Sequence, residues 1–123
     1  MTIKELCELS HKQAVEKGFW GKGYHIIYKS KPTEIIDYDK SERNVSELLM
    51  LMVTELGEAC EALRHDNPKS EHIPNFSGIE EEMADLMIRI GDFCEAKNIR
   101  LEEAIKAKMK FNKTRPYKHG KSF

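Results

Sequence analysis

The sequence lacks a net charge of any size, and it also lacks a long apolar segment. Its 20 Lys and Arg residues nearly balance 21 Asp and Glu residues, which leaves a formal charge of −1. This balance gives no indication of a nucleic-acid polymer or an anionic membrane as a partner. No apolar run approaches the roughly 20 residues that cross a bilayer, and acids in the first turns argue against a secretory signal. For a chain of 123 residues we therefore expect one cytoplasmic domain, 1–123, without a membrane partner.

Cysteine is scarce as well. The chain has three, Cys7, Cys60 and Cys94, which is an odd number, and they lie far apart without the spacing of metal ligands. Isolated cysteines in an intracellular protein are usually reduced and packed as small apolar side chains. We therefore expect all three to be reduced core residues.

Acidic residues are missing from the end of the chain. Residues 104–123 contain seven Lys or Arg and no acid, so residues 1–103 carry a balance of −8. One interpretation is a basic last helix that complements its own dipole beside an acidic body. The other is a cationic tail that folds over an anionic ligand held by the acidic part. Charge alone leaves both open.

Signals for β-structure are absent too, because Val and Ile do not alternate with polar residues over any useful length. Apolar residues instead recur at helical spacing, and two capping boxes, Thr2–Glu5 and Ser77–Glu80, indicate helix starts. The sequence therefore predicts an all-α domain. Its four expected helices cover residues 3–17, from Ser41 or Asn44 to His65, 77–97 and 101–112.

The segment 18–40 differs from the rest because it combines glycines and a proline with five aromatic residues. We expect an ordered but irregular connection, and a loop of this length usually serves function or an interface. It contains Trp20, the single tryptophan. An indole would stack on a nucleotide base; alternatively, Phe19 and Trp20 anchor the loop to the core.

Two pairs of acids occupy unusual positions on the second and third predicted helices. On a helical wheel Glu55 lies about 60° from the centre of the apolar stripe, with Glu58 one turn away on the same flank. Glu82 lies about 40° from the stripe centre of its own helix, inside the apolar face, and Asp85 is on the same flank. If the two helices pack against one another, four carboxylates come together.

Such a group of acids needs compensation, since like charges at the edge of a core are costly. A hard divalent cation with oxygen ligands supplies it, so the pattern predicts a site for Mg²⁺, or alternatively Mn²⁺. Mg²⁺ also keeps bound water, which suits hydrolysis of a phosphate chain. The competing interpretation is that these acids are solvated or paired with lysines.

A di-iron bundle is a further alternative, but it requires two Glu-x-x-His motifs on separate helices. Glu8-Leu-Ser-His11 is one candidate, and the other predicted helices lack a second. We therefore expect His11 to be a surface residue or a partner of Glu8. Asp92 continues the flank of the acid pair, and we expect it to pair with Arg89, at the surface or behind a metal.

The last predicted helix places polar residues on its apolar stripe. Lys108 and Asn112 follow Leu101 and Ile105 at helical spacing, so we expect both to point inward toward the other helices. Lys108 would then offer a point charge to a phosphate and Arg115 a bidentate contact, while Asn112 would bond a sugar, a base or a metal-bound water. Alternatively, Lys108 snorkels from an ordinary apolar face and Arg115 is exposed or ion-paired.

The motif Glu55-x-x-Glu58, a spacer of 23 residues and Glu82-x-x-Asp85 resembles the all-α nucleoside triphosphate pyrophosphohydrolases of the MazG type. The surrounding segments 54–64 and 81–92 are similar to the two acidic helices of that family. The segment Lys108–Lys121 resembles the end of its shorter members, and Gly18-Phe-Trp20 resembles their early loop. The resemblance is weakest over residues 22–40, where this chain carries extra residues.

This resemblance implies a compact domain like a four-helix bundle, with a long irregular connection between its first two helices. It implies Mg²⁺ on Glu55, Glu58, Glu82 and Asp85, and cleavage of a nucleoside triphosphate to a monophosphate and pyrophosphate. It also implies a homodimer or a dimer of dimers, with sites near the subunit interfaces. Glu55 or Glu58 is the candidate to orient or deprotonate the attacking water.

Two alternatives remain beside this hypothesis. The same apolar stripes would serve a non-catalytic helical module that binds or regulates another protein, since a fold does not establish an activity. A metal-dependent hydrolase of another phosphate compound would use the same carboxylates.

Overall fold

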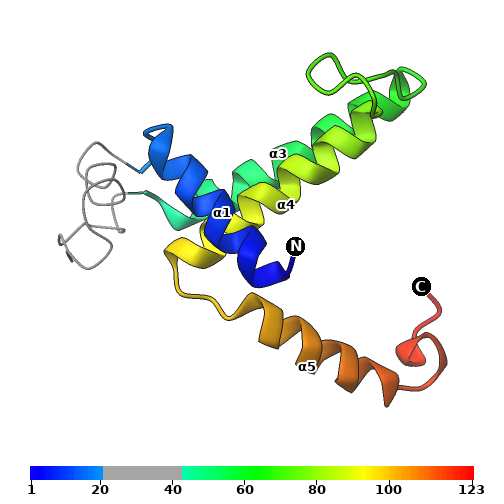
Figure 1. The fold of residues 1–123 in the computed structure, drawn as a ribbon. Helices are drawn as coiled ribbons and strands as arrows, with labels where there is room; N and C mark the ends of the chain where they lie inside the picture. The colour runs from blue at the N-terminus through cyan, green and yellow to red at the C-terminus, as the bar shows by residue number, and fades with distance from the viewer. Residues whose placement is uncertain (21–42) are drawn as a thin grey trace, which may run out of the picture.

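The computed structural model describes residues 1–20 and 43–123, and every regular element in them is helical (Figure 1). The predicted helices are confirmed to within one or two residues, and the described residues contain only an isolated bridge between Lys69 and Ser77 in place of strands. The predicted connection lies mostly outside the described residues. Along the described part of the chain, no helix combines the length and apolarity of a membrane-spanning segment. The elements are α1 (Ile3–Glu16), α3 (Val45–Arg64), α4 (Gly78–Ala96), α5 (Leu101–Lys113) and a final 3₁₀ turn, η1 (Tyr117–Gly120).

Side-chain caps fix where the helices begin. Thr2 and Ser77 each form a complete capping box with the glutamate three residues later, at the starts of α1 and α4. Asn44 starts α3, because its side-chain oxygen accepts the backbone N–H of Glu47 at 3.1 Å. Of the two predicted starts for this helix, the structure therefore selects Asn44 over Ser41.

Three helices form the packed body. The helices α3 and α4 run side by side as a hairpin, and α1 packs across α4 near the open end of the hairpin (Figure 1). The most buried cluster consists of Val15, Trp20, Leu48 and Ala96, with Phe93 packed against it. This body places the middle turns of α3 and α4, which carry the acid pairs, opposite one another.

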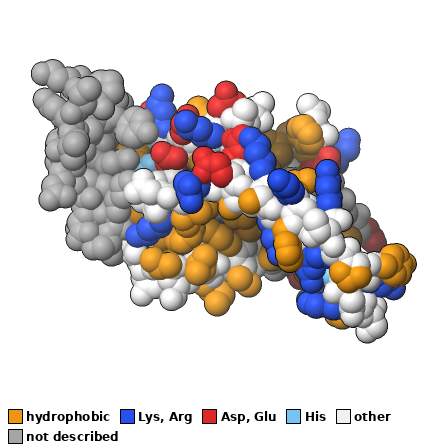
Figure 2. Space-filling model, turned by 90° about the horizontal axis from the view of Figure 1, so that it is seen from below, with side chains coloured by type: hydrophobic (Ala, Val, Ile, Leu, Met, Phe, Trp, Pro, Cys, Tyr) orange, Lys and Arg blue, Asp and Glu red, His pale blue; other side chains and the backbone are white. Residues whose placement is uncertain are grey.

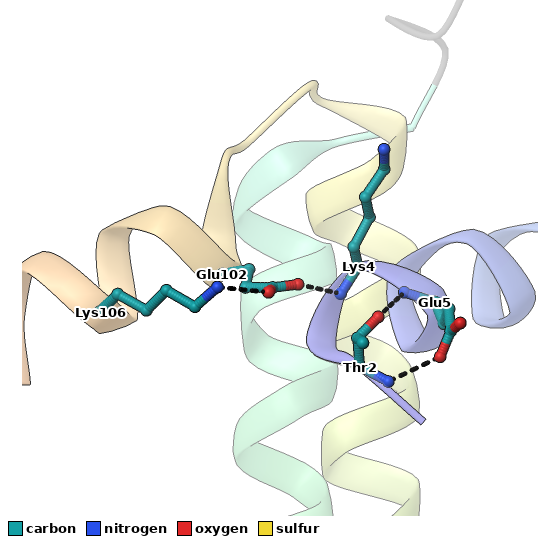
Figure 3. A network of polar contacts seen from close by, with 5 residues as sticks. All are labelled: Thr2, Lys4, Glu5, Glu102 and Lys106. Carbon is teal, nitrogen blue, oxygen red and sulfur yellow. Dashed lines mark hydrogen bonds and ion pairs between the residues drawn. The ribbon is translucent and has the colours of Figure 1, made fainter.

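The helix α5 projects away from this body (Figure 1). Three helices are therefore packed together, whereas the sequence predicted a bundle of four. None of the residues of α5 is buried. Its first turn is attached to α1, where Glu102 accepts the backbone N–H of Lys4 at 3.0 Å and the ammonium group of Lys106 at 2.7 Å (Figure 3). Leu101 and Ile105 are partly buried near this attachment, but beyond them no described helix covers the apolar stripe of α5.

The cysteines divide into two kinds. Cys7 and Cys94 are buried and free, which confirms the prediction that they are core residues, and burial raises the pKa of both thiols. Cys60 is exposed on α3, so its prediction as a core residue is wrong. The wheel placed it on the apolar stripe of α3, but that stripe is wider than the surface that α4 covers.

Gly91 sets the close approach of α1 to α4. A Cβ atom at this position would lie 3.0 Å from the Ser10 hydroxyl oxygen and 3.3 Å from the Leu6 carbonyl oxygen, and real Cβ atoms rarely come so close. Gly57, in the interior of α3, has nothing within 4 Å of the same point. The two glycines therefore differ in packing although both are helical.

We expect Gly91→Val to destabilise the protein by about 2 kcal/mol or more, because the side chain would push α1 off α4. The matched change Gly57→Val should stay within about 0.5 kcal/mol of the wild type, since valine and glycine differ little in an exposed helix. Urea unfolding followed by circular dichroism measures both. Equal effects of the two substitutions would contradict this account of the α1–α4 contact.

Candidate metal centre

Three carboxylates meet between α3 and α4. One oxygen each from Glu55, Glu82 and Asp85 lies within 4.8 Å of the other two. Glu55 is only 4% exposed, Glu82 is partly buried and Asp85 is exposed. Glu58, one turn further along α3, is exposed, yet its charge acts on both Glu55 and Glu82. The structure therefore brings together the acids that the wheel placed on facing flanks. We call these four residues the acid cluster.

Three carboxyl groups of the acid cluster have raised pKa values. Burial, a hydrogen bond to Glu55 and the charge of Glu58 raise the pKa of Glu82 to about 7. The pKa of Glu58 is raised by its hydrogen bond to Glu55, by partial desolvation and by the charge of Glu55. Partial desolvation of the carboxyl group, followed by the charge of Glu55, raises the pKa of Asp85. Without an added cation, the acid cluster therefore retains protons toward neutral pH.

The side chains of the cluster fit a divalent cation. Oε2 of Glu82 is buried and has no hydrogen-bond partner. A buried, unpaired carboxylate oxygen is costly, and a cation held by Glu55, Glu82 and Asp85 would compensate it. All donors offered here are oxygens, which are the ligands that Mg²⁺ and Mn²⁺ prefer.

Arg89 is a member of the site that the sequence did not reveal. It lies one turn after Asp85 on α4, and its Nε–H donates a hydrogen bond to Oε1 of Glu55. Burial opposes ionisation of Glu55, but the hydrogen bond and charge of Arg89, together with hydrogen bonds from Glu58 and Glu82, lower its pKa. On the helical wheel, Arg89 lies on the same flank of its helix as Glu82, and this is the one signal in the sequence that Arg89 belongs to the site. The wheel does not identify Glu55 as its partner.

A cavity of about 430 Å³ opens beside the acid cluster, between α1, α3 and α4. Glu55, Asp85 and Arg89 form part of its wall, and Lys17 and Arg43 are also among its lining residues. Leu51, Ile88 and Phe19 add apolar surface. This volume falls within the range of about 300–1,000 Å³ that is usual for small-molecule sites. The cavity therefore combines apolar walls, three cationic side chains and the edge of the acid cluster.

A buried polar network adjoins this cavity, because its central acceptor, Asp92, is one of the lining residues. Asp92 accepts a hydrogen bond from Nδ1 of His11 at 2.7 Å and from Nε1 of Trp20 at 2.8 Å. His11 is 1% exposed and Trp20 is 3% exposed, and the guanidinium group of Arg43 lies 4.9 Å from the centre of the indole ring.

This network corrects several expectations. His11 is neither a surface residue nor a partner of Glu8, and Asp92 pairs with His11 and Trp20 rather than with Arg89. Burial of Trp20 supports the interpretation that it anchors the chain to the core and leaves little indole surface for a base. Phe19, by contrast, is 66% exposed and does not share this anchoring role.

The polar residues of α5 and the tail lie apart from the cavity. Lys108 is exposed, with its ammonium group 4.8 Å from the centre of the Phe111 ring, so its predicted inward orientation is wrong within one chain. Arg115 is partly buried beside the same ring, and Asn112 is partly buried with an unpaired Oδ1. None of the three lines the cavity. The apolar stripe on which the prediction rested has no partner helix here.

Glu81 forms an ion pair with a residue outside the acid cluster. Nδ1 of His72, in the linker between α3 and α4, lies 2.6 Å from Oε1 of Glu81. Hydrogen bonds from Ser70 and His72 lower the pKa of Glu81. Glu81 is therefore engaged elsewhere, and Glu82 faces the other acids.

Comparison of the chain with protein-family models, with curated proteins and with solved structures found no match in any of the three. The resemblance to MazG-type enzymes therefore stays an expectation from the sequence. Any functional conclusion depends on the acid cluster and the cavity, where the chemistry of the side chains is specific. The helical fold alone would suit many functions.

Proposed function

We propose that the protein is a Mg²⁺-dependent hydrolase that cleaves a ribo- or deoxyribonucleoside triphosphate to a nucleoside monophosphate and pyrophosphate. The observation that carries this proposal is the buried, unpaired oxygen of Glu82 beside Glu55 and Asp85, two residues that line a cavity of about 430 Å³. A carboxylate cluster for a hard cation next to a cavity with cationic side chains suits a phosphate chain attached to an apolar base.

The side chains take separate parts in this proposal. Glu55, Glu82 and Asp85 would hold Mg²⁺, with Mn²⁺ as a substitute, and the bound ion would neutralise phosphate charge and acidify a water molecule. Glu58, exposed next to them and with a raised pKa, would accept a proton from that water. Lys17 and Arg43 add positive charge to the cavity for the rest of the phosphate chain.

Pyrophosphate release from a panel of ribo- and deoxyribonucleoside triphosphates, with Mg²⁺ and with chelator, tests the proposal. Metal-dependent release of pyrophosphate, and not of orthophosphate, is the expected result. Orthophosphate release would favour a hydrolase of another phosphate compound. No release by folded protein would favour the non-catalytic helical module.

We further propose that the protein self-associates as a homodimer or a dimer of dimers. One stripe of exposed side chains runs along the length of α3 within about 80° of arc, and no described helix covers it. Apolar side chains also gather over the centre of the face seen in Figure 2. A second copy would bury this stripe. The stripe consists of Val45, Leu49, Val53, Leu56, Cys60 and Leu63.

Light scattering during gel filtration should therefore give twice or four times the 14.3 kDa of one chain. Val53→Glu, in the middle of the stripe, should shift the particle toward the monomer because it places a charge in the interface. Thr54→Glu adds the same charge to the adjacent exposed position, off the stripe, and should leave the mass unchanged. A monomeric wild type would exclude self-association through this surface.

A further inference from the structure

The ion pair of Arg89 with Glu55 joins the acid cluster to the cavity. The Glu55 side chain is 5% exposed, whereas that of Arg89 is 41% exposed, and both residues line the cavity. Among the described residues, Arg89 is the one lysine or arginine that forms an ion pair with a member of the cluster. Its guanidinium group therefore holds the position of a counter-ion at the inner end of the cavity.

One arginine compensates only part of the charge in this cluster. The charge of Arg89 favours ionisation of Glu55, and it also opposes the rise in pKa of Glu58 and Asp85. Glu82 nevertheless keeps a buried oxygen without a partner. The cluster is thus balanced by one positive charge where a divalent cation would supply two.

The single negative charge of Glu55 cannot fully compensate both a bound cation and the guanidinium group of Arg89. If a cation takes Oε1 of Glu55, the guanidinium group loses its partner and needs another anion. Asp92, less than one turn further along α4, already accepts hydrogen bonds from Trp20 and His11. The cavity that Arg89 lines is therefore the space where it would find a new partner.

We propose that Arg89 is an exchangeable counter-ion: it holds Glu55 until a divalent cation binds, then turns into the cavity and binds a phosphate group of the ligand. This inference rests on the proposed function, since it takes the acid cluster to be the cation site. A guanidinium group suits the task because its planar fork matches phosphate oxygens. Cation binding and phosphate binding are then coupled, and each strengthens the other.

Calorimetric titrations of wild type and Arg89→Met test the exchange without relying on turnover. Methionine keeps the length and apolar stem of the side chain but removes its charge. Mg²⁺ alone should bind Arg89→Met about tenfold more tightly, because no guanidinium group has to leave Glu55. Inorganic pyrophosphate, added at saturating Mg²⁺, should bind Arg89→Met at least about tenfold more weakly, because a charge-assisted hydrogen bond is lost.

Two further variants make the result decisive. Arg100→Met removes an exposed arginine that pairs with Glu103 on α5, and both affinities should stay at the wild-type values. Arg89→Lys keeps the charge but loses the fork, so Mg²⁺ affinity should match wild type while pyrophosphate binding weakens; this variant also serves if Arg89→Met does not fold.

The outcomes separate this inference from the proposed function. A wild type that binds Mg²⁺, with Arg89 variants that bind Mg²⁺ and pyrophosphate as the wild type does, overturns the exchange alone. Weaker Mg²⁺ binding by folded Arg89→Met also overturns it, because Arg89 would then support the cation site. A wild type that binds no Mg²⁺ at millimolar concentrations overturns the proposed function, and the exchange with it.

Discussion

Glu82→Gln is expected to lower the rate of pyrophosphate release by at least about 100-fold, the scale of losing one group that stabilises charge at a reacting centre. Glutamine preserves the shape of the side chain but removes the charge that would hold the cation. Glu82 is the most informative of the acids because its Oε2 is buried and unpaired. The measurement is turnover of the best substrate from the nucleotide panel at saturating Mg²⁺.

The same substitution should stabilise the metal-free protein at high pH. The pKa of Glu82 is raised to about 7 in the folded state from an ordinary value of 4.5, so the folded state binds this proton more tightly than the unfolded state does. Stability from this group is complete below pH 4.5 and is lost as pH rises through 7. In chelator at pH 8, Glu82→Gln should therefore melt above wild type, and the difference should shrink at pH 5.

Glu61→Gln is the matched control for both measurements. Glu61 lies on α3 outside the acid cluster, with its side chain 58% exposed and paired at the surface with Arg64 and His65. It should change turnover less than twofold and melting by less than about 1 °C, because exposed pairs contribute little. If Glu82→Gln is fully active, or if it loses activity only because it unfolds, the assignment of the site is wrong.

The helices could be predicted because their signals are local. The capping boxes at Thr2 and Ser77 and the spacing of apolar residues act within one or two turns, and the structure places the helices at those limits. The packing of α5 could not be predicted in the same way. Its apolar stripe indicated a buried face, but a stripe does not state which surface covers it. In this chain the stripe remains open, and Lys108 on it is exposed.

The acid cluster was accessible from the sequence for a geometrical reason. A carboxylate inside an apolar stripe, such as Glu82, must face a neighbouring helix, and an acid pair on the next helix offers the complement. The wheel gives the direction of a side chain but not the partner it meets. The bond from Arg89 to Glu55, 34 residues away in the sequence, depends on how α3 and α4 are rotated and shifted against one another.

The network around Asp92 shows the same limit over a longer range. His11 and Asp92 are 81 residues apart, and Trp20 and Asp92 are 72 residues apart. The sequence favours a pair of His11 with Glu8, three residues away on the same helix, because that contact needs no tertiary structure. The structure instead uses Asp92 to attach the C-terminal half of α1, through His11, and the segment after it, through Trp20, to α4.

Asp92→Ala should therefore be one of the most destabilising single changes in the chain. It removes hydrogen bonds from two buried donors to a charged acceptor, each worth about 1.5–3 kcal/mol, so we expect a loss of about 3–6 kcal/mol. For a domain of this size that is a large fraction of the total stability. Urea unfolding, followed both by circular dichroism and by the fluorescence of Trp20, would measure it.

Two control substitutions decide whether the hydrogen bonds of Asp92 or the local contacts of Glu8 contribute more to the stability of the fold. Asp92→Asn keeps an acceptor oxygen of the same shape, so it should cost less than half as much as alanine. Glu8→Ala should cost no more than about 0.5 kcal/mol, because Glu8 is exposed and only 3.9 Å from Lys4 in a surface pair. A larger loss from Glu8→Ala than from Asp92→Ala would contradict the structure and restore the local pairing.

If Asp92→Ala is the more destabilising change, the attachment of α1 to α4 through Asp92 is what holds Trp20 and the wall of the cavity in place. Asp92→Asn should then also weaken ligand binding more than Glu8→Ala does.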